Sequence, residues 1–228
     1  MTEGCRCTVL ASGGGTNLQA LLDRQAAGDL GANITAVLSD QPAAGALERA
    51  RAAGVPTQAL APGDYPDRDA FDRALAEAVA ATQPDLVVLA GFMRILGAPF
   101  VERFAGLTLN IHPSLLPAFR GLHTHRKALE AGCRLHGTTV HFVTADLDAG
   151  PIVAQAAVRV RDDDTPDSLR ARVQAREHRL LPQAVHWFAE GRLEVDGNRV
   201  RVAGHGEDEG HLEAPALELN SEPGAPTL

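Results

Sequence analysis

Cysteine is scarce in this sequence of 228 residues, which contains only Cys5, Cys7 and Cys133. Small secreted domains that are cross-linked by disulfides contain more cysteines, in an even number. Three cysteines therefore favour a reducing compartment. A metal site on the pair Cys5 and Cys7 would need further ligands at matching spacing, which we do not find. Both residues are expected to be ordinary cysteines near the edge of a first strand.

Long apolar runs are also missing, although 45% of the residues are hydrophobic and can fill a core. No stretch is long and apolar enough to cross a membrane, and no basic segment followed by an apolar one opens the chain. Neither membrane anchoring nor secretion is indicated. We expect a cytoplasmic protein with no membrane partner.

Basic residues are outnumbered, with 21 Lys and Arg against 29 Asp and Glu, a net charge of −8. Nucleic-acid binders cluster Lys and Arg to hold phosphates, so small molecules are the expected partners and nucleic acid is not. From Glu207 onward acidic residues meet no Lys or Arg amid glycine and proline. We expect one domain over residues 1–203 and an acidic, disordered tail over 204–228. The sequence leaves open whether the protein is a monomer or a homodimer.

The chain does contain a regular alternation of short apolar runs and helical patterns. The runs are typical of strands and lie at residues 8–11, 34–38, 56–60, 85–90 and 107–111. Helical spacing of apolar residues separates them at 18–22, 46–53, 71–79 and 99–104. This predicts an α/β fold with a doubly wound, mostly parallel, Rossmann-like sheet. Ligands bind such sheets beyond the carboxyl ends of the strands.

The pattern changes after Gly137, where residues 139–143 and 152–160 are typical of strands joined by a segment too short for a helix. These residues predict an antiparallel C-terminal portion of the sheet. Thr165 followed by Pro166 is typical of a helix start, and Pro182 is expected to kink or divide that helix. A hairpin around residues 196–198 is expected to close the fold.

A glycine loop at residues 12–17, Ser-Gly-Gly-Gly-Thr-Asn, joins the first strand to the first helix. Free backbone N–H groups and the helix dipole suit a phosphate there, with a plain tight turn as the alternative. The loop lacks the third glycine of a dinucleotide fingerprint, and Asp40 is only a loose candidate for its acidic residue. A nucleotide-dependent oxidoreductase is therefore a remote alternative.

Asn110 and His112 are two residues apart at the end of a strand, so their side chains point to the same side. An amide and an imidazole can then converge on one atom, although a capped strand end with a satisfied histidine shows the same pattern. A carboxylate from Asp148 near His112 would orient the imidazole for proton transfer or oxyanion stabilisation. An ordinary Asx turn is the alternative for Asp148.

His123 and His125 suggest a metal site, but two histidines need a third ligand. The adjacent Arg126 and Lys127 would repel a cation. The metal interpretation is the weaker one, and the basic pair can instead help to hold a phosphate.

Five segments together resemble the phosphoribosylglycinamide formyltransferases, a folate-dependent family of purine synthesis. They are Gly-Gly-Gly-Thr-Asn at 13–17, Leu-Ala-Gly-Phe-Met-Arg-Ile-Leu at 89–96, Asn-Ile-His-Pro-Ser-Leu-Leu-Pro at 110–117, Gly-Leu-His-Thr-His at 121–125 and Asp-Leu-Asp-Ala-Gly-Pro at 146–151. Parts of this set also occur in methionyl-tRNA formyltransferase and formyltetrahydrofolate hydrolase. The segment at 121–125 and the length of the chain favour the first family, with the hydrolase as the closest alternative.

The resemblance implies an enzyme that moves a formyl group from 10-formyltetrahydrofolate, its cosubstrate, to the amine of 5-phospho-ribosylglycinamide without a metal. It implies catalytic roles for Asn110, His112 and Asp148. It implies that the substrate is bound by Gly15, Thr16, Asn17, Gly91, Ile111, Pro113 and Glu177. It implies that the folate is bound by Arg68, Met93, Arg94, Ile95, Leu96, Thr144 and Asp148. Residues 118–120 and Ala149 depart from the family pattern without touching a reacting group.

Overall fold

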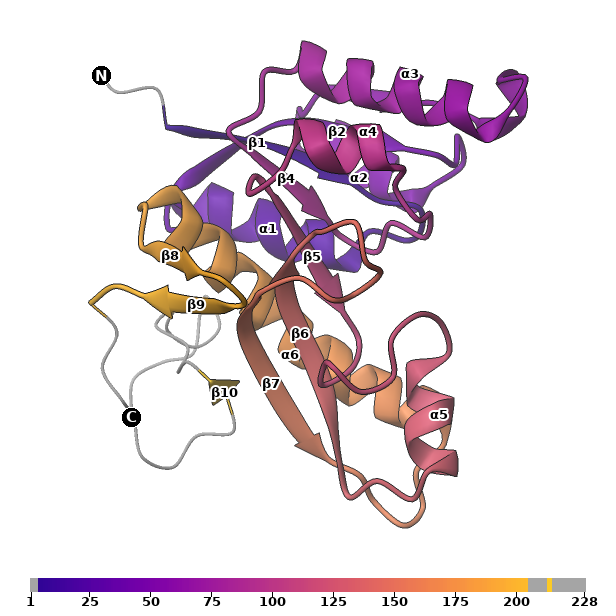
Figure 1. Ribbon diagram of the computed structural model, residues 1–228, viewed down its shortest axis with the longest axis vertical. Coiled ribbons are helices and arrows are strands. Elements are labelled where there is room, and N and C mark those ends of the chain that lie inside the picture. The colour runs from indigo at the N-terminus through magenta and orange to yellow at the C-terminus, as the bar shows by residue number, and fades with distance from the viewer. Residues whose placement is uncertain (1–3, 205–212, 215–228) are drawn as a thin grey trace.

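The computed structural model describes residues 4–204 and 213–214, which form a ten-stranded sheet flanked by helices (Figure 1). The strands are β1 (Cys5–Leu10), β2 (Ala32–Ser39), β3 (Thr57–Ala59), β4 (Leu86–Leu89), β5 (Thr108–His112), β6 (Leu135–Phe142), β7 (Ile152–Arg159), β8 (Leu193–Asp196), β9 (Arg199–Val202) and β10 (Glu213–Ala214). The helices are α1 (Thr16–Ala27), α2 (Gly45–Ala52), α3 (Arg68–Ala81), α4 (Ala98–Arg103), α5 (Thr124–Glu130) and α6 (Pro166–Ala189), with a 3-10 turn at Pro62–Asp64.

The first half of the sheet is parallel, with the strand order β3-β2-β1-β4-β5. The order reverses between β1 and β4, and in doubly wound sheets ligands bind at such a reversal. β4 is buried along its whole length, because helices cover both faces of a parallel sheet and leave no solvent-facing side. The predicted doubly wound fold is confirmed.

The second half of the sheet is antiparallel, as predicted, apart from one short parallel pairing between β7 and β9. β5 pairs with β6 and β6 pairs with β7 in this sense, so the chain reverses twice without a helix. β8 and β9 form the expected terminal hairpin, and β9 meets β7. β10 pairs with β7, while the rest of the expected tail, residues 205–212 and 215–228, lies outside the described residues.

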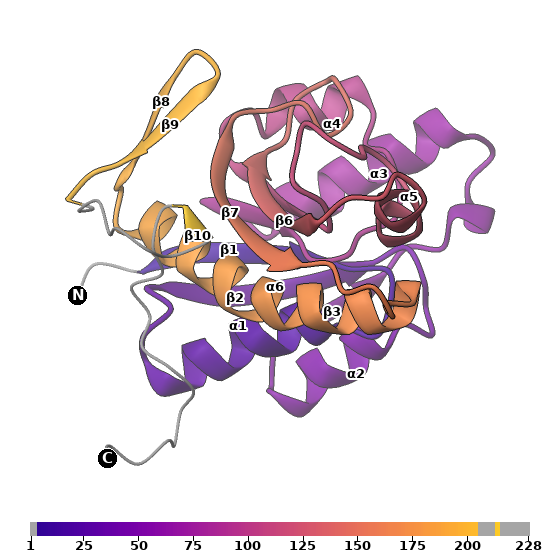
Figure 2. The ribbon, with the colours of Figure 1, turned by 90° about the horizontal axis from the view of Figure 1, so that it is seen from below.

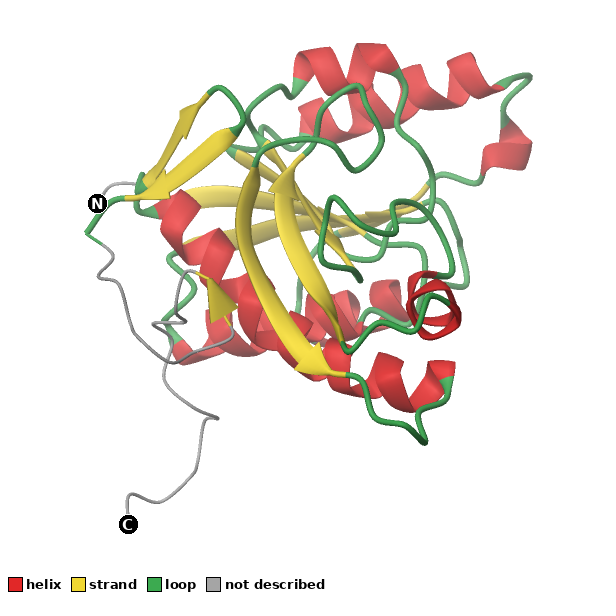
Figure 3. Ribbon diagram, turned by 60° about the horizontal axis from the view of Figure 1, so that its bottom comes forward, coloured by secondary structure: helices red, strands yellow, loops and turns green. Residues whose placement is uncertain are grey.

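Two layers of helices enclose the sheet. α1, α2 and α6 lie on one side and α3 and α4 on the other, which Figure 2 shows from below and Figure 3 by secondary structure. The larger core cluster joins the first group of helices to the sheet and includes Leu18, Leu47 and Trp187. The second cluster contains Phe71 and Phe100 on the opposite face. The two core clusters pack against opposite faces of the sheet, and together they fix the positions of the strand ends.

Two details of the helices differ from the sequence predictions. Pro182 does not divide α6, which runs through it as one helix, because the buried side chains of Leu181 and Val185 pack this stretch into the larger core. α5 is a short helix of seven residues that the sequence pattern does not predict. No helix in residues 4–204 is long and apolar enough to cross a membrane.

Candidate active site

A cleft of about 610 Å³ opens beyond the carboxyl ends of β1, β4 and β5. Its lining comes from the glycine loop, the segment after β4, the end of β5, the turn between β6 and β7, and one face of α6. Two of these loops are tied together, since the N–H of Ser12 donates to the Gly91 carbonyl at 3.1 Å and the N–H of Met93 donates to the Ser12 hydroxyl at 2.9 Å. The structure thus brings widely separated sequence segments to one cavity.

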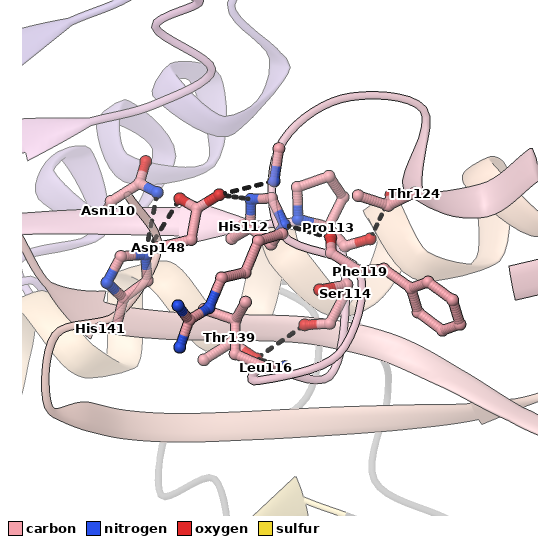
Figure 4. Close-up of polar contacts among 12 residues, drawn as sticks. Asn110, His112, Pro113, Ser114, Leu116, Phe119, Thr124, Thr139, His141 and Asp148 are labelled. Carbon is pink, nitrogen blue, oxygen red and sulfur yellow. Dashed lines mark hydrogen bonds and ion pairs between the residues drawn. The ribbon is translucent and has the colours of Figure 1, made fainter. Parts of the chain in front are cut away.

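Asn110 is held by His141, which lies opposite it on the neighbouring strand β6 (Figure 4). His141 Nδ1 lies 2.8 Å from the Phe142 carbonyl, an acceptor, so this nitrogen carries the proton. Burial lowers the pKa of His141, which favours the neutral ring. Its Nε2 is then an acceptor for the Asn110 amide N–H at 3.0 Å. One amide proton of Asn110 is fixed in this way, and the second is available to the cleft.

His112 and Asp148 face each other across the cleft wall, with Nδ1 and Oδ2 3.5 Å apart. Both side chains are 8% exposed. A carboxylate at this distance attracts an imidazolium N–H. The other ring nitrogen, Nε2, donates to the Phe119 carbonyl at 3.0 Å, and Asp148 Oδ2 accepts the N–H of Gly121 at 2.8 Å. The loop before α5 therefore holds both members of the pair.

The loop that follows β5 is itself anchored to the antiparallel strands (Figure 4). The Thr139 hydroxyl donates to the Ser114 carbonyl at 2.7 Å. The Gln155 amide donates to the Leu116 carbonyl at 2.9 Å. These bonds satisfy backbone groups of a segment that has no ladder partners of its own, and they keep the Phe119 carbonyl near His112.

The glycine loop and α6 form the other end of the cleft. Gln174 donates to the Thr16 hydroxyl at 2.8 Å, and Asn17 donates to Glu177 at 2.9 Å. Burial raises the pKa of Glu177, and the bond from Asn17 opposes that change. Gly15 has a φ of 73°, and a Cβ there would lie 2.6 Å from the Cα of Ala46. Glycine is therefore required at the turn into α1.

The segment after β4 carries exposed apolar side chains, with Met93 66% and Ile95 56% exposed. Arg94 stacks over the Phe71 ring at 4.8 Å from its centroid. Arg68 donates to the Ile95 carbonyl at 2.9 Å and pairs with Asp72 at 3.5 Å. Arg68 supports this segment from behind and, unlike the other residues expected to bind ligands, does not line the cleft.

His125, which is half-buried and lines the cleft, pairs with the buried His136, with Nδ1 of the first and Nε2 of the second 3.1 Å apart. His136 also bonds to the Pro113 carbonyl, so its Nδ1 carries the proton and its Nε2 accepts from His125. Burial, reinforced by the neighbouring His125, lowers the pKa of His136 to about 4. Burial also lowers the pKa of His125, with the nearby Arg170 as the next cause.

The low pKa of His136 predicts a loss of stability in acid. As the pH falls below 6.5, the usual value, the unfolded chain gains a proton that the folded chain does not take up until about pH 4. The contribution of His136 to the free energy of unfolding is therefore expected to decrease across this window and to level off below it. Denaturant melts at several pH values measure this decrease, with His136→Gln as the comparison. An NMR titration of His136 with a midpoint near 6.5 would contradict the expectation.

The remaining candidates lie outside the reacting end. Arg126 pairs with Glu130 at 3.8 Å, and Lys127 donates to the Arg120 carbonyl at 3.3 Å. Neither lines the cleft, so the idea that they help to hold a phosphate gains no support from their positions. No group of three or more His, Cys, Asp or Glu side chains suited to a metal occurs among the residues with described positions.

The cleft wall also includes residues that were not among the candidates, of which Arg170 and Gln174 lie on α6 together with Glu177. Their spacing of four and three residues places all three on one helical face. With Glu177 expected to bind the substrate, this spacing is the signal in the sequence that points to Arg170 and Gln174. His141 lies within the strand expected at residues 139–143, and nothing in the sequence marks it as a residue of the site.

Comparison with known proteins identifies the family of the chain. The family model described as "Formyl transferase" matches residues 5–185. The chain is 48% identical over 208 residues to a phosphoribosylglycinamide formyltransferase of Escherichia coli, covering 88% of this chain and 98% of that protein. A glycinamide ribonucleotide transformylase structure from Symbiobacterium toebii superposes with a TM-score of 0.86 at 51% identity, covering 89% and 95% of the two chains.

A more distant structure is a formyltetrahydrofolate deformylase from Pseudomonas syringae, with a TM-score of 0.82 at 29% identity. The match covers 88% of this chain but only 66% of that one. The two full-length likenesses are thus to transferases, and the deformylase carries additional sequence. On the family match and these identities, the chain belongs to the formyl transferase family.

Proposed function

We propose that this enzyme transfers a formyl group from 10-formyltetrahydrofolate to the amine of 5-phospho-ribosylglycinamide, a step of purine biosynthesis. The observation that carries the proposal is one continuous cleft with the Asn110, His112 and Asp148 side chains in its wall and the glycine loop at one end. The high identity to phosphoribosylglycinamide formyltransferases supports this substrate.

The residues at the centre suit the chemistry of acyl transfer. As the amine nitrogen bonds to the formyl carbon, the formyl oxygen gains negative charge. The free amide N–H of Asn110 and an imidazolium at His112 stabilise that charge in a preorganised site. The bond to the folate nitrogen then breaks, the amine loses a proton and the folate nitrogen gains one. Asp148 supports the imidazolium and relays the proton through water.

One contact has to change for His112 to act in this way. Its Nε2–H donates to the Phe119 carbonyl and its Nδ1 faces Asp148. Donation to a formyl oxygen therefore requires that Nε2 exchange the Phe119 carbonyl for the substrate or share its proton between the two acceptors.

The ends of the cleft suit the two ligands. Backbone N–H groups at Gly15, Thr16 and Asn17, at the start of α1, suit the substrate phosphate. Glu177 is placed to accept from ribose hydroxyl groups. The folate is expected to lie along Met93, Ile95, Leu96 and Thr144, with Gly91, Ile111 and Pro113 towards the substrate side. Arg94 is available to a folate carboxylate, and Arg68 supports the segment through Ile95.

A direct assay tests the proposal. The purified protein is mixed with 10-formyltetrahydrofolate, with and without 5-phospho-ribosylglycinamide, and both formylated ribonucleotide and free formate are measured. We expect formylated ribonucleotide to form and formate to stay at the background level. Release of formate in the absence of the ribonucleotide would instead indicate the hydrolase, to which the deformylase structure is similar. Reduction of an added nicotinamide cofactor would indicate the alternative of a nucleotide-dependent oxidoreductase.

We further propose that the enzyme works in the cytoplasm, since Cys5, Cys7 and Cys133 are all free thiols. Burial and the nearby Asp85 carboxylate raise the pKa of Cys5 to about 11, and burial raises the pKa of Cys7 further. Both remain protonated and unreactive. In solution we expect a monomer or a homodimer, which light scattering distinguishes.

A further inference from the structure

The glycine loop is held from behind by α2 through two of its carbonyl groups. The Gly13 carbonyl accepts the backbone N–H of Ala46 at 3.1 Å. The Gly14 carbonyl accepts Nε–H of Arg49 at 2.8 Å. The same guanidinium donates from its Nη1 atom to the Gln19 amide oxygen at 3.0 Å, which ties α2 to α1 as well. Arg49 thus bridges the loop and the helix that follows it.

These bonds decide which way the loop's donors point. In a trans peptide the C=O and N–H groups point in opposite directions. Anchoring the Gly13 and Gly14 carbonyls on α2 therefore turns the N–H groups of Gly14 and Gly15 away from α2. Neither N–H donates a hydrogen bond to another group in residues 4–204, and both residues line the cleft. The loop presents two unused donors at the end where the phosphate is proposed to bind.

We propose that Arg49 is a positioning residue, which presets the Gly14 and Gly15 N–H groups for the substrate phosphate without touching the substrate. The inference rests on the proposed function. Three glycines in a row leave the loop free to adopt many backbone conformations, and ordering them on binding costs affinity. The Arg49 bond to the Gly14 carbonyl removes much of that freedom before the substrate arrives. The effect of Arg49 on substrate affinity should therefore appear only with substrates that carry the phosphate.

A second contact from α2 acts on the same peptide. Gly45, the first residue of α2, packs against Gly14, and a Cβ at Gly45 would lie 3.3 Å from both the Cα and the carbonyl oxygen of Gly14. This is closer than an ordinary van der Waals contact, so Gly45→Ala is expected to push the loop while leaving the Arg49 charge in place. This variant therefore distinguishes positioning of the loop by α2 from direct electrostatic attraction between Arg49 and the phosphate.

The test compares 5-phospho-ribosylglycinamide with the dephosphorylated ribosylglycinamide as formyl acceptors. Arg49→Met is expected to raise KM for the phosphorylated acceptor about tenfold, the size of a lost hydrogen bond from a charged donor. KM for the dephosphorylated acceptor and for the folate should change little. Gly45→Ala should shift the same KM in the same direction, and Arg49→Lys, which keeps a donor for Gly14, should recover part of the loss. Arg51→Met, exposed on the same helix, serves as the matched control.

The outcomes separate this inference from the function on which it rests. A wild-type protein that formylates neither acceptor contradicts the proposed function. If the wild type is active, unchanged kinetics in Arg49→Met overturn the positioning role. Equal losses with both acceptors also overturn it, since they indicate general damage to the fold. If Gly45→Ala and Arg49→Lys both had the KM of the wild type, the loss in Arg49→Met would come from the charge of Arg49 alone. That result would also overturn the positioning role.

Discussion

Asp148→Asn is expected to lower kcat for formyl transfer by about a thousandfold. The change removes the negative charge that faces His112 Nδ1 and the group that takes up a proton, while the size of the side chain stays the same. Asp148 has a φ of 48°, a left-handed conformation that asparagine also tolerates, so the backbone should be retained. The amide oxygen can still accept the N–H of Gly121. Steady-state kinetics with both substrates varied measure the loss.

The control for this variant is Asp163→Asn, which removes a carboxylate from the exposed turn before α6. Its kinetics are expected to match those of the wild type. KM values for Asp148→Asn should stay within a few fold, since the lost interaction acts mainly on the transition state. A kcat near the wild-type value would show that Asp148 has no part in proton transfer and would leave its contact with His112 as a structural one.

Gly150→Ala is expected to disturb both stability and activity. A Cβ at Gly150 would lie 1.9 Å from the Phe142 carbonyl oxygen and 3.0 Å from Thr144 Cγ2. Since the first obstacle is backbone, the turn between β6 and β7 must move. We expect a loss of roughly 1–3 kcal/mol of folding free energy, the usual range for overpacking. Because Asp148 lies on the same turn, kcat should fall as well. Thermal melts and kinetics measure the two effects.

Gly63→Ala is the matched control, since a Cβ at Gly63 would have no atom within 4 Å. Its melting temperature and kcat are expected to be unchanged. If Gly150→Ala also behaved like the wild type, the close approach of the turn to the Phe142 carbonyl would be wrong, and with it the placement of Asp148 beside His112.

The parallel half of the fold could be predicted from the sequence because each strand there is a separate apolar run. β4 is buried on both faces, and β1 leads directly into a glycine loop. The sequence therefore indicates both the strands and the end of the sheet at which a ligand binds. The antiparallel half was also visible, since the segment between residues 143 and 152 has no room for a helix. Pro182 does not divide α6, because burial of this stretch in the core outweighs the hydrogen bond that proline removes.

α5 and the surroundings of the site could not be predicted in the same way. α5 is short, and its N-cap, His123, has a φ of 61° and makes no capping bond through its side chain. The usual serine, threonine or aspartate signal is therefore missing. His141 holds Asn110 only because β5 and β6 pair with these two residues opposite each other. That register joins positions 31 residues apart, and spacing along the chain does not reveal it.

Trp187 is the only tryptophan in the sequence, and it lies fully buried near the end of α6. It is ten residues beyond Glu177, which at 1.5 Å per residue is about 15 Å along the helix. Indole emission depends on the polarity around the ring, so its fluorescence should change sharply when the core opens and little when the cleft fills. This enzyme therefore carries a built-in optical reporter of global unfolding, which remains readable in variants whose cleft has been altered.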